Sequence, residues 1–584
     1  FSAPLFSSSV IKNSLHLRLM EKNEIREGIV NSIGYNGEGI IKEDNFVIFV
    51  PFSLPGEKIS YKVLKVHKNI VYGKLLEVKT PAENRERPIC SVYTKCGGCQ
   101  YQHLRYYRQL KQKSLVVQDC LKKIAKFNIE VPLTVKSDLI YGYRNKLVIP
   151  VNRDESGVKI GFYACNSHRI VDTTDCSLHS SWVKDVIQCF RTYIAQNNVY
   201  CYSEQDKNGS LRHIVVREIN GKFIIVAVTK DKLKNVDKLI EILQTKFKFF
   251  SLYINYNDKD TNVVTGENFD LVYGESGLMQ TDFGITYEVG PQTFLQVNNG
   301  VKIKLYSDIK KFVSNCNANF VIDAYSGAGL LSSIIAKSGN TVHSVEIVKE
   351  ACVYAEKLAK NNGIQEKMIV HYGDCSIVIP QIIEGCNGDF QIILDPPRKG
   401  VDRKLLSLIK NSKPKQIIYC SCSPQTLSRD LGIILGTINE ESGEIVKNDL
   451  PVSEYEISYI QPYDMFPQTK HVETLVVLSH KKPDSHIEVK IDFDNTSLDK
   501  SAIAERAEKR KPKDKPTYKD IQDWVEKNYG FKVHTAYIAE VKRNEGLPMY
   551  DAPNAVEELK RPRSHPTAEM VEAIKDALKH FGII

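Results

Sequence analysis

The residue with the clearest chemical potential in this chain is Cys422, in the segment 419–424 (YCSCSP). A cysteine thiolate is a strong nucleophile, although most buried cysteines are inert packing residues. The apolar run 416–421 predicts a strand, so Cys420 and Cys422 point to the same side and Cys422 lies nearer the turn at Pro424. A carboxylate, Glu473, stands directly before the last apolar strand. Cys422 is therefore a candidate nucleophile, and the rest of the chain must indicate its substrate.

The segment 321–330 (VIDAYSGAGL) predicts a strand, a glycine turn and a helix. Gly327 and Gly329 would let the backbone approach a ligand. Glu346 ends the next strand, where a carboxylate can accept hydrogen bonds from ribose hydroxyls. Asp374 stands where a third strand would end and could bind an adenine amino group. Because the turn has two glycines rather than the three of the dinucleotide fingerprint, S-adenosylmethionine fits better than NAD.

The loop 395–398 (DPPR), which begins at Asp395, follows a further apolar strand at 390–394. Paired prolines stiffen the backbone, and ligands bind at the carboxyl edge of a parallel sheet. Short apolar strands alternate with amphipathic helices over residues 286–482, which predicts a doubly wound sheet with helices on both faces. All the candidate residues named so far lie at the ends of predicted strands in this domain.

A chain of 584 residues indicates several domains, and we expect a multidomain α/β protein. Residues 22–80 predict a small, OB-like antiparallel β-barrel of about five strands, which could grip nucleic acid or serve only as a stabilising accessory domain. Residues 81–285 predict a central, mostly β domain that holds a cysteine cluster and a basic helix over 106–126.

The two ends of the chain differ from these domains in composition. We expect residues 1–21 to form a disordered leader with Met20 as the natural start; a degenerate targeting peptide is the alternative. Residues 483–515 predict a basic linker, and 516–584 a small helical appendage with helices that follow Thr517 and span 534–544 and 567–581.

Four cysteines, Cys90, Cys96, Cys99 and the distant Cys176, have the spacing of a metal-binding set. Four thiolates suit zinc or an iron–sulfur cluster, and the spacing alone leaves both open. Fourteen cysteines in a large chain without a clear secretory signal indicate a reducing compartment. We therefore expect a cytoplasmic protein.

The charge balance is mildly basic, with 79 basic and 70 acidic residues and a net charge of +9. This charge is compatible with RNA binding. No apolar run approaches the roughly 20 residues that span a bilayer, so we expect no membrane association. We also expect a monomer.

Five motifs together resemble the RNA uracil-5-methyltransferases: 323–329 (DAYSGAG), 395–398 (DPPR), 421–424 (SCSP), 464–467 (DMFP) and 471–474 (HVET). They occur in the family's order and spacing within residues 22–480. One departure is Ser423, where the family carries asparagine, and the cysteine before it is in place. The resemblance implies a class I methyltransferase domain that uses S-adenosylmethionine, and it implies that the barrel is TRAM-like.

The resemblance also implies how the residues act. Cys422 would add to carbon 6 of uracil and so make carbon 5 nucleophilic, and Glu473 would then remove the carbon-5 proton. The cofactor contacts would be made by Gln296, Asp323, Tyr325, Glu346 and Asp395, beside Gly327, Gly329 and Asp374.

The same resemblance favours a [4Fe–4S] cluster on Cys90, Cys96, Cys99 and Cys176, as in the family's ribosomal RNA branch. It favours 23S ribosomal RNA as the partner, because the transfer RNA branch usually lacks the barrel and the four cysteines. The target base must leave its stack, so single-stranded or loop RNA is expected. Residues that could meet phosphates or stack on bases are Arg144, Lys146, Arg105, Arg108, Lys111, Lys113, Tyr101, Tyr106 and Tyr107.

Three alternatives remain. The substrate could be transfer RNA. The product could be 5-methylcytosine, although the loop 395–398 has no cysteine, which that chemistry requires in a Pro-Cys context. The protein could be a non-catalytic RNA-binding assembly factor, against which Cys422 and Glu473 argue. The appendage could contact nucleic acid through Lys542, Arg543, Arg561 and Arg563.

Overall fold

The computed structural model describes residues 20–154, 157–446, 453–481, 518–545, 566–581 and 583. The chain divides into two compact units, one ending at Pro483 and one beginning at Asp484. The predicted linker and all but two residues of the predicted leader lie outside the described residues. Within those ranges, every helix is too short or too polar to cross a membrane.

The first sheet of the larger unit has six strands in the order β1-β5-β6-β4-β3-β2. Its edge strands β1 and β2 are neighbours in sequence, so the sheet curls back on itself around Ile48, Ile59 and Tyr61. The prediction of a purely antiparallel barrel is wrong for one pair: β4 and β6 run parallel, because the chain passes through β5 on the far side of β6 before it returns. The strands are β1 (Ile25–Ile29), β2 (Ser32–Ile33), β3 (Glu38–Glu43), β4 (Phe46–Pro51), β5 (Lys58–His67) and β6 (Ile70–Thr80).

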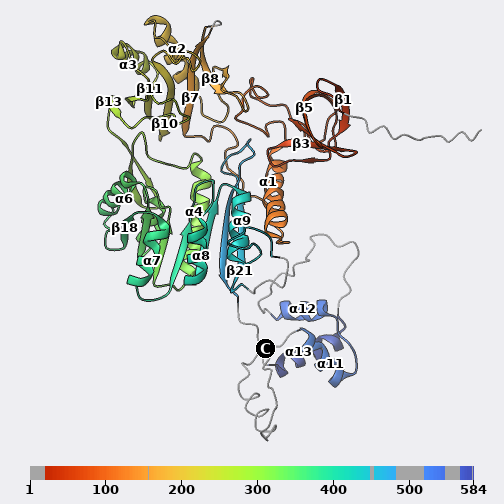
Figure 1. Ribbon diagram of the computed structural model, residues 1–584. Coiled ribbons are helices and arrows are strands. Elements are labelled where there is room, and N and C mark those ends of the chain that lie inside the picture. Colours follow the sequence, from red (N-terminus) through yellow and green to blue (C-terminus); the bar gives the residue numbers. More distant parts are fainter. Residues whose placement is uncertain are drawn as a thin grey trace, which may run out of the picture. The chain divides into compact units, whose positions relative to one another are not determined.

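The second sheet has seven strands in the order β13-β12-β11-β10-β7-β8-β9. Two helices, α2 (Trp182–Gln196) and α3 (Val236–Gln244), cover one of its faces (Figure 1). The strands are β7 (Lys146–Asp154), β8 (Gly157–Tyr163), β9 (Ile170–Asp172), β10 (Leu211–Ile219), β11 (Lys222–Thr229), β12 (Phe250–Tyr256) and β13 (Phe269–Tyr273), and a hairpin of β14 (Leu278–Asp282) and β15 (Ile285–Val289) follows.

The third sheet has the order β18-β17-β16-β19-β20-β22-β21, and the strand sequence reverses direction between β16 and β19. Its first five strands are parallel, and β22 runs antiparallel between β20 and β21. The strands are β16 (Phe320–Ala324), β17 (Val342–Glu346), β18 (Met368–Tyr372), β19 (Phe390–Leu394), β20 (Gln416–Ser421), β21 (Tyr455–Tyr463) and β22 (Glu473–His480).

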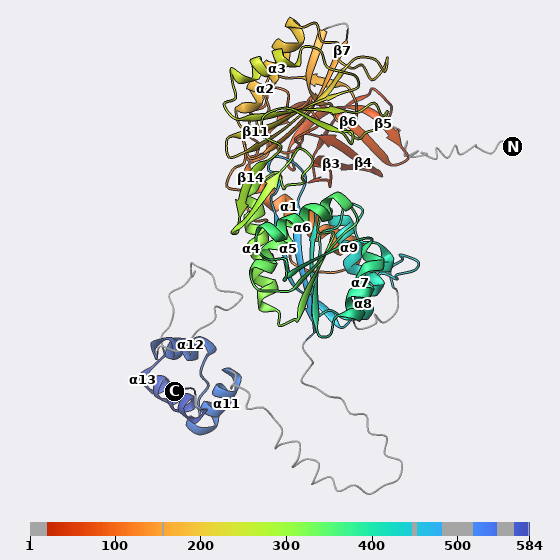
Figure 2. The ribbon, with the colours of Figure 1, turned by 90° about the vertical axis from the view of Figure 1, so that its left-hand side faces the viewer.

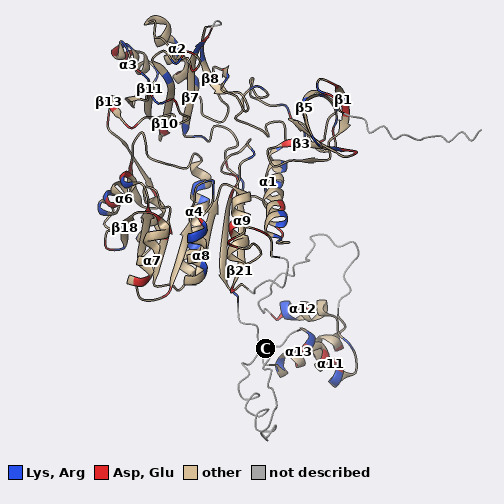
Figure 3. Cartoon of the chain, viewed as in Figure 1, with Lys and Arg blue, Asp and Glu red and all other residues tan. Residues whose placement is uncertain are grey.

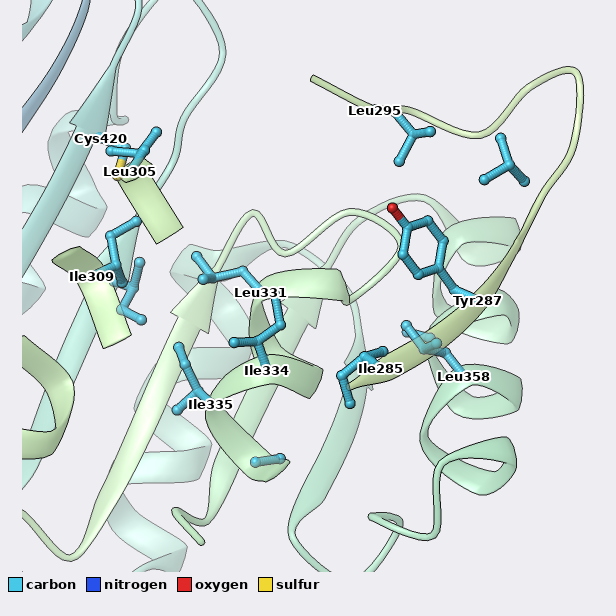
Figure 4. Packing of buried hydrophobic residues seen from close by; sticks show 14 of the residues in the cluster. Ile285, Tyr287, Leu295, Leu305, Ile309, Leu331, Ile334, Ile335, Leu358 and Cys420 are labelled. Carbon is cyan, nitrogen blue, oxygen red and sulfur yellow. The ribbon is translucent and has the colours of Figure 1, made fainter. Parts of the chain in front are cut away.

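Helices cover both faces of this sheet, as Figure 2 shows, so the predicted α/β arrangement is confirmed. One face packs on α4 (Asn299–Asn315), α5 (Leu330–Lys337) and α6 (Lys349–Asn361), through side chains such as Leu305 and Ile334 (Figure 4). The other face packs on α7 (Cys375–Gly385), α8 (Arg403–Ser412) and α9 (Pro424–Ile434). Helix α1 (Tyr106–Cys120) and the π-helix η1 (Leu121–Ala125) join this second face through Val117 and Leu121, although they precede the sheet by some 200 residues of sequence.

The described part of the smaller unit contains α11 (Tyr518–Tyr529), α12 (Thr535–Asn544) and α13 (Ala568–His580), around a core that includes Ile521, Val525 and Ile574. His534 and Thr567 cap α12 and α13 with their side chains. The predicted cap Thr517 lies outside the described residues, as do Arg561 and Arg563.

Candidate active site

A cleft of about 810 Å³ opens where the strand order reverses, at the carboxyl ends of the parallel strands. This is where ligands bind in doubly wound sheets. The cleft brings together the predicted residues Gln296, Asp323, Tyr325, Gly327, Glu346, Asp374, Asp395, Cys422 and Glu473. Gly329 does not line it. At Gly329 (φ +77°), an added Cβ would lie 2.9 Å from the Cβ of Ala355 in α6, so the positive φ and the close approach of that helix both favour glycine.

The turn after β16 forms one wall of the cleft. Gly327 (φ +55°) donates its backbone N–H to Glu346 at 2.9 Å, and the other oxygen of Glu346 accepts the Val348 N–H at 2.9 Å. Tyr325 also has a positive φ, +63°, which strains a residue that is not glycine. Two backbone N–H groups thus fix the Glu346 carboxylate at the end of β17, while its remaining lone pairs stay available to a ligand.

Asp323 and Asp374 differ in their electrostatic surroundings. Asp323 is buried and accepts a hydrogen bond from Ser332, and burial raises its pKa to about 7. Asp374 caps α7 by accepting the Ser376 N–H at 2.8 Å, and its hydrogen bonds with Ser376 lower its pKa. Asp374 is therefore a structural cap as well as a cleft residue.

Cys422 follows β20 at the turn into α9 and is half-buried. Burial raises the pKa of its thiol, and the nearby Glu473 raises it further. Arg398 opposes both effects through its positive charge and a hydrogen bond to the thiol. Cys420 instead lies in the hydrophobic core beside Leu305 (Figure 4).

Glu473 begins β22 and is 5% exposed. Burial and the negative charge of Asp395 raise its pKa well above the ordinary range, and Arg398 lowers it. Burial also raises the pKa of Asp395, to about 6. Two buried carboxyl groups that repel each other favour holding a proton, so an ionised Glu473 would be a strong base.

Two further residues, one lining the cleft and one that interacts with its lining, carry no signal in a single sequence. Tyr306 of α4 interacts with Asp395, Asp323 and Glu473, but a tyrosine on an amphipathic helix looks like any other core residue. Tyr35, in the turn between β2 and β3, interacts with Arg398 and Cys422, and only folding brings the first sheet to this place.

Comparisons with known proteins agree with this geometry. Residues 386–481 match the family model of tRNA (uracil-5-)-methyltransferases. An RNA methyltransferase of Clostridium acetobutylicum is 36% identical over 466 residues, which cover 79% of this chain and 98% of that protein. One from Halalkalibacterium halodurans is 34% identical over 468 residues, which cover 79% and 98%. The chain belongs to the RNA uracil-5-methyltransferase family.

A solved structure of this family also matches. The tRNA (uracil-54, C5)-methyltransferase of Pyrococcus abyssi, in complex with S-adenosyl-L-homocysteine, has a TM-score of 0.61 and 25% identity and covers 77% of this chain and 99% of its own. The uracil-5-methyltransferase fold therefore extends beyond the third sheet, and its enzymes depend on S-adenosylmethionine.

The four predicted metal-binding cysteines of this methyltransferase, Cys90, Cys96, Cys99 and Cys176, line one small cavity of about 50 Å³. Burial raises the pKa of all four thiols, to about 12 for Cys99 and Cys176. Two donors already face sulfur: the Gly98 N–H on Cys96 and the Gln102 amide on Cys99, each at 3.3 Å. In the described ranges no three His, Cys, Asp or Glu side chains converge closely enough to hold one metal ion.

The predicted RNA-binding residues of the methyltransferase fall into two groups. Basic residues occur along α1 (Figure 3). Arg108, Lys111 and Tyr107 of this helix and Arg105 just before it are exposed, and the Lys111 Nζ lies 4.8 Å from the Tyr107 ring centre. The predictions for Lys113 and Tyr101 are wrong, because both side chains are buried, Lys113 in an ion pair.

The two residues predicted from the central domain are less exposed than those on α1. Arg144 faces the cysteine cavity, and Lys146 is half-buried in β7.

Proposed function

We propose that this protein methylates carbon 5 of a uridine in RNA through a covalent adduct between Cys422 and carbon 6. The observation that carries the proposal is that Cys422, Glu473, Asp395 and Arg398 line the same cleft as the glycine turn after β16. Carbon 5 of uracil is a weak nucleophile, and only addition of a nucleophile at carbon 6 makes it reactive.

Cys422 begins the reaction as a thiolate. Arg398 favours this form, because its guanidinium donates to the sulfur and offsets the burial of the thiol. The thiolate bonds to carbon 6, the ring electrons move to form an enolate, and carbon 5 then takes the methyl group. S-adenosylmethionine, when bound, supplies that methyl group as an electrophile on a sulfonium. Gln296, Asp323, Tyr325, Gly327, Gly329, Glu346, Asp374 and Asp395 are the residues proposed to hold it.

Glu473 completes the reaction. Its carboxylate takes the proton from carbon 5, the electron pair of that C–H bond reforms the carbon 5–carbon 6 double bond, and the bond from carbon 6 to the Cys422 sulfur breaks. The high pKa that burial and Asp395 give Glu473 makes it a better proton acceptor once ionised. Cys422 is thereby released as a thiolate, and Glu473 returns to its carboxylate form when it passes the proton to solvent.

We propose that Cys90, Cys96, Cys99 and Cys176 hold a [4Fe–4S] cluster that supports the fold. The support for this proposal is that all four thiols line one cavity. A cluster binds each thiolate through a different iron and so holds the sulfurs farther apart. Iron and sulfide analysis of anaerobically purified protein, with absorbance at about 400 nm, tests this; stoichiometric zinc would refute it.

We propose 23S ribosomal RNA as the substrate, on the strength of the first sheet and the four cysteines. Transfer RNA is the second candidate, because the Pyrococcus abyssi enzyme acts on uracil 54 of transfer RNA and matches 77% of this chain. That coverage extends beyond the residues of the third sheet, so the presence of accessory sheets does not by itself decide between the two substrates. Mass-spectrometric mapping of 5-methyluridine in both RNAs, from cells with and without the gene, decides between them.

A further inference from the structure

Two cations of the central sheet have no anionic partner in the part of the chain that the structure describes. Lys146 of β7 lies directly opposite Arg217 of β10 in an antiparallel pair. Arg217 is 3% exposed, and its buried Nε has no hydrogen-bond partner. The next side chains on the same face, Val148 and Val215, are apolar and pack into the core.

The two facing cations destabilise the folded state. Like charges directly opposite each other on neighbouring strands repel, and burial removes the water that would stabilise each cation. Burial, with the repulsion of Arg217, lowers the pKa of Lys146 to about 8. Burial lowers that of Arg217 to about 10. Among the residues that the structure describes, no carboxylate interacts with either group, so a bound anion would relieve the unfavourable burial of two positive charges.

The pair lies beside the catalytic cleft. Asn145, which precedes Lys146, donates its side-chain N–H to the backbone oxygen of Gln296 at 3.1 Å and its backbone N–H to Val297 at 3.1 Å. Gln296 lines the cleft. The cysteine thiols interact with Arg144 but with neither Lys146 nor Arg217. The negative charge of a bound cluster would therefore not neutralise this pair of cations.

We propose that Lys146 and Arg217 form a subsite for one phosphodiester group of the RNA chain that carries the target uridine. The planar guanidinium can bind two phosphate oxygens at once, and the ammonium supplies a second charge. This inference rests on the proposed function, since it takes RNA as the substrate. It adds Arg217 to the RNA-binding residues and gives a physical reason for the half-buried Lys146.

The test uses Lys146→Met, Arg217→Met and the double variant in the full-length protein. Each single variant should raise the melting temperature in the absence of RNA, because an unpaired buried charge is removed. The same variants should weaken binding of a fluorescein-labelled single-stranded oligouridylate. The slope of log affinity against log salt should fall by about 0.7 for each cation removed. A gain in stability joined to a loss of RNA affinity is the signature of a ligand site.

Arg212, on the same strand, is the matched control. It is also buried, but its guanidinium donates to the backbone oxygens of Asn257 at 2.5 Å and Lys259 at 3.1 Å. Arg212→Met should therefore lower the melting temperature and leave the salt slope unchanged. If Arg217→Met behaves like Arg212→Met, the pair is structural and the proposal is overturned.

An experiment with inorganic phosphate tests whether the site binds a phosphodiester of RNA or a free anion. At fixed ionic strength, phosphate in place of chloride should raise the melting temperature of the wild type and not of the double variant. Stabilisation by phosphate with an unchanged RNA slope would mean a site for free anions, which overturns the RNA assignment. The wild type could form no 5-methyluridine while the salt slope of RNA binding still falls in the Lys146 and Arg217 variants. In that case the proposed reaction is refuted and the RNA subsite is supported.

Discussion

Lys113 and Asp464, 351 residues apart in sequence, form an ion pair of 2.5 Å in which neither side chain is exposed. The pair joins α1 to the loop before β22, and Lys113 also donates to the backbone oxygen of Phe466 at 3.0 Å. Gln109, one turn earlier on α1, exchanges hydrogen bonds with Gln468 of the same loop. Helix α1 thereby fixes the segment that leads to Glu473.

Replacing only one partner of this ion pair should lower the free energy of unfolding. Lys113→Met leaves the Asp464 charge buried without a partner, and we expect a loss of about 3–5 kcal/mol in the free energy of unfolding. The double variant Lys113→Met/Asp464→Met should recover most of that loss, because both charges are gone. Denaturant titrations of the three proteins measure this, with the exposed Lys111→Met as control. Equal losses in the single and double variants would show that the charges do not interact.

The cleft could be predicted from the sequence because its residues stand at the ends of strands. Parallel strands bring their carboxyl ends to one edge, so Glu346, Asp395 and Cys422 had to meet once the alternating pattern was recognised. The sequence also predicted helices over 534–544 and 567–581, and the structure shows that the side chains of His534 and Thr567 cap them by accepting a backbone N–H.

Long-range pairings could not be predicted in this way. Helical spacing puts Lys113 three residues after Leu110 and four before Val117, on the buried face of α1, but its partner Asp464 gives no signal because it lies 351 residues away. The parallel pairing of β4 with β6 depends on how the chain passes β5. The approach of Tyr35 to Cys422 likewise depends on contacts between sheets.

Cys422→Ala should abolish formation of 5-methyluridine, because it removes the thiol proposed to add to carbon 6. Binding of S-adenosylhomocysteine should persist, since the proposed cofactor residues lie mainly at the ends of the neighbouring strands β16, β17 and β18. Calorimetric titration and mass spectrometry of the RNA measure the two effects. The control is Cys420→Ala, which changes a core residue and should retain turnover. Methylation by Cys422→Ala would refute its assignment as the nucleophile.

Glu473→Gln should stop the reaction after methyl transfer, because an amide cannot remove the carbon-5 proton. The protein should then accumulate as a covalent RNA adduct, which denaturing gel electrophoresis detects as a slowly migrating band. The band should be absent from the double variant Cys422→Ala/Glu473→Gln. Normal turnover by Glu473→Gln, or no adduct with intact RNA binding, would count against Glu473 as the base.

Arg398→Gln should raise the pH at which Cys422 reacts with iodoacetamide. The guanidinium favours the thiolate, so its removal leaves burial and Glu473 to raise the thiol pKa unopposed. Alkylation rates from pH 6 to 10, followed by mass spectrometry of the Cys422 peptide, give the midpoint. Lys399→Gln changes the next residue, which does not interact with the thiol, and should leave the midpoint in place. An unchanged or lower midpoint in Arg398→Gln would contradict the role of Arg398.

Asp323→Asn should stabilise the ligand-free protein more at pH 8 than at pH 5. Burial raises the folded-state pKa of Asp323 to about 7, above its unfolded value, so the folded state binds the extra proton. The carboxyl group therefore costs stability that grows as pH rises from about 4 to about 7 and stays in full above, on the order of 4 kcal/mol. Melting temperatures at the two pH values measure the difference.

Asp374→Asn is a control for which the expected change in melting temperature has the opposite sign. Hydrogen bonds with Ser376 lower the folded-state pKa of Asp374, so its contribution to stability is present above the unfolded pKa and is lost as pH falls through the folded pKa. Asp374→Asn should therefore lower the melting temperature at pH 8. If Asp323→Asn lowers it too, the hydrogen bond from Ser332 outweighs the cost of burying the Asp323 charge.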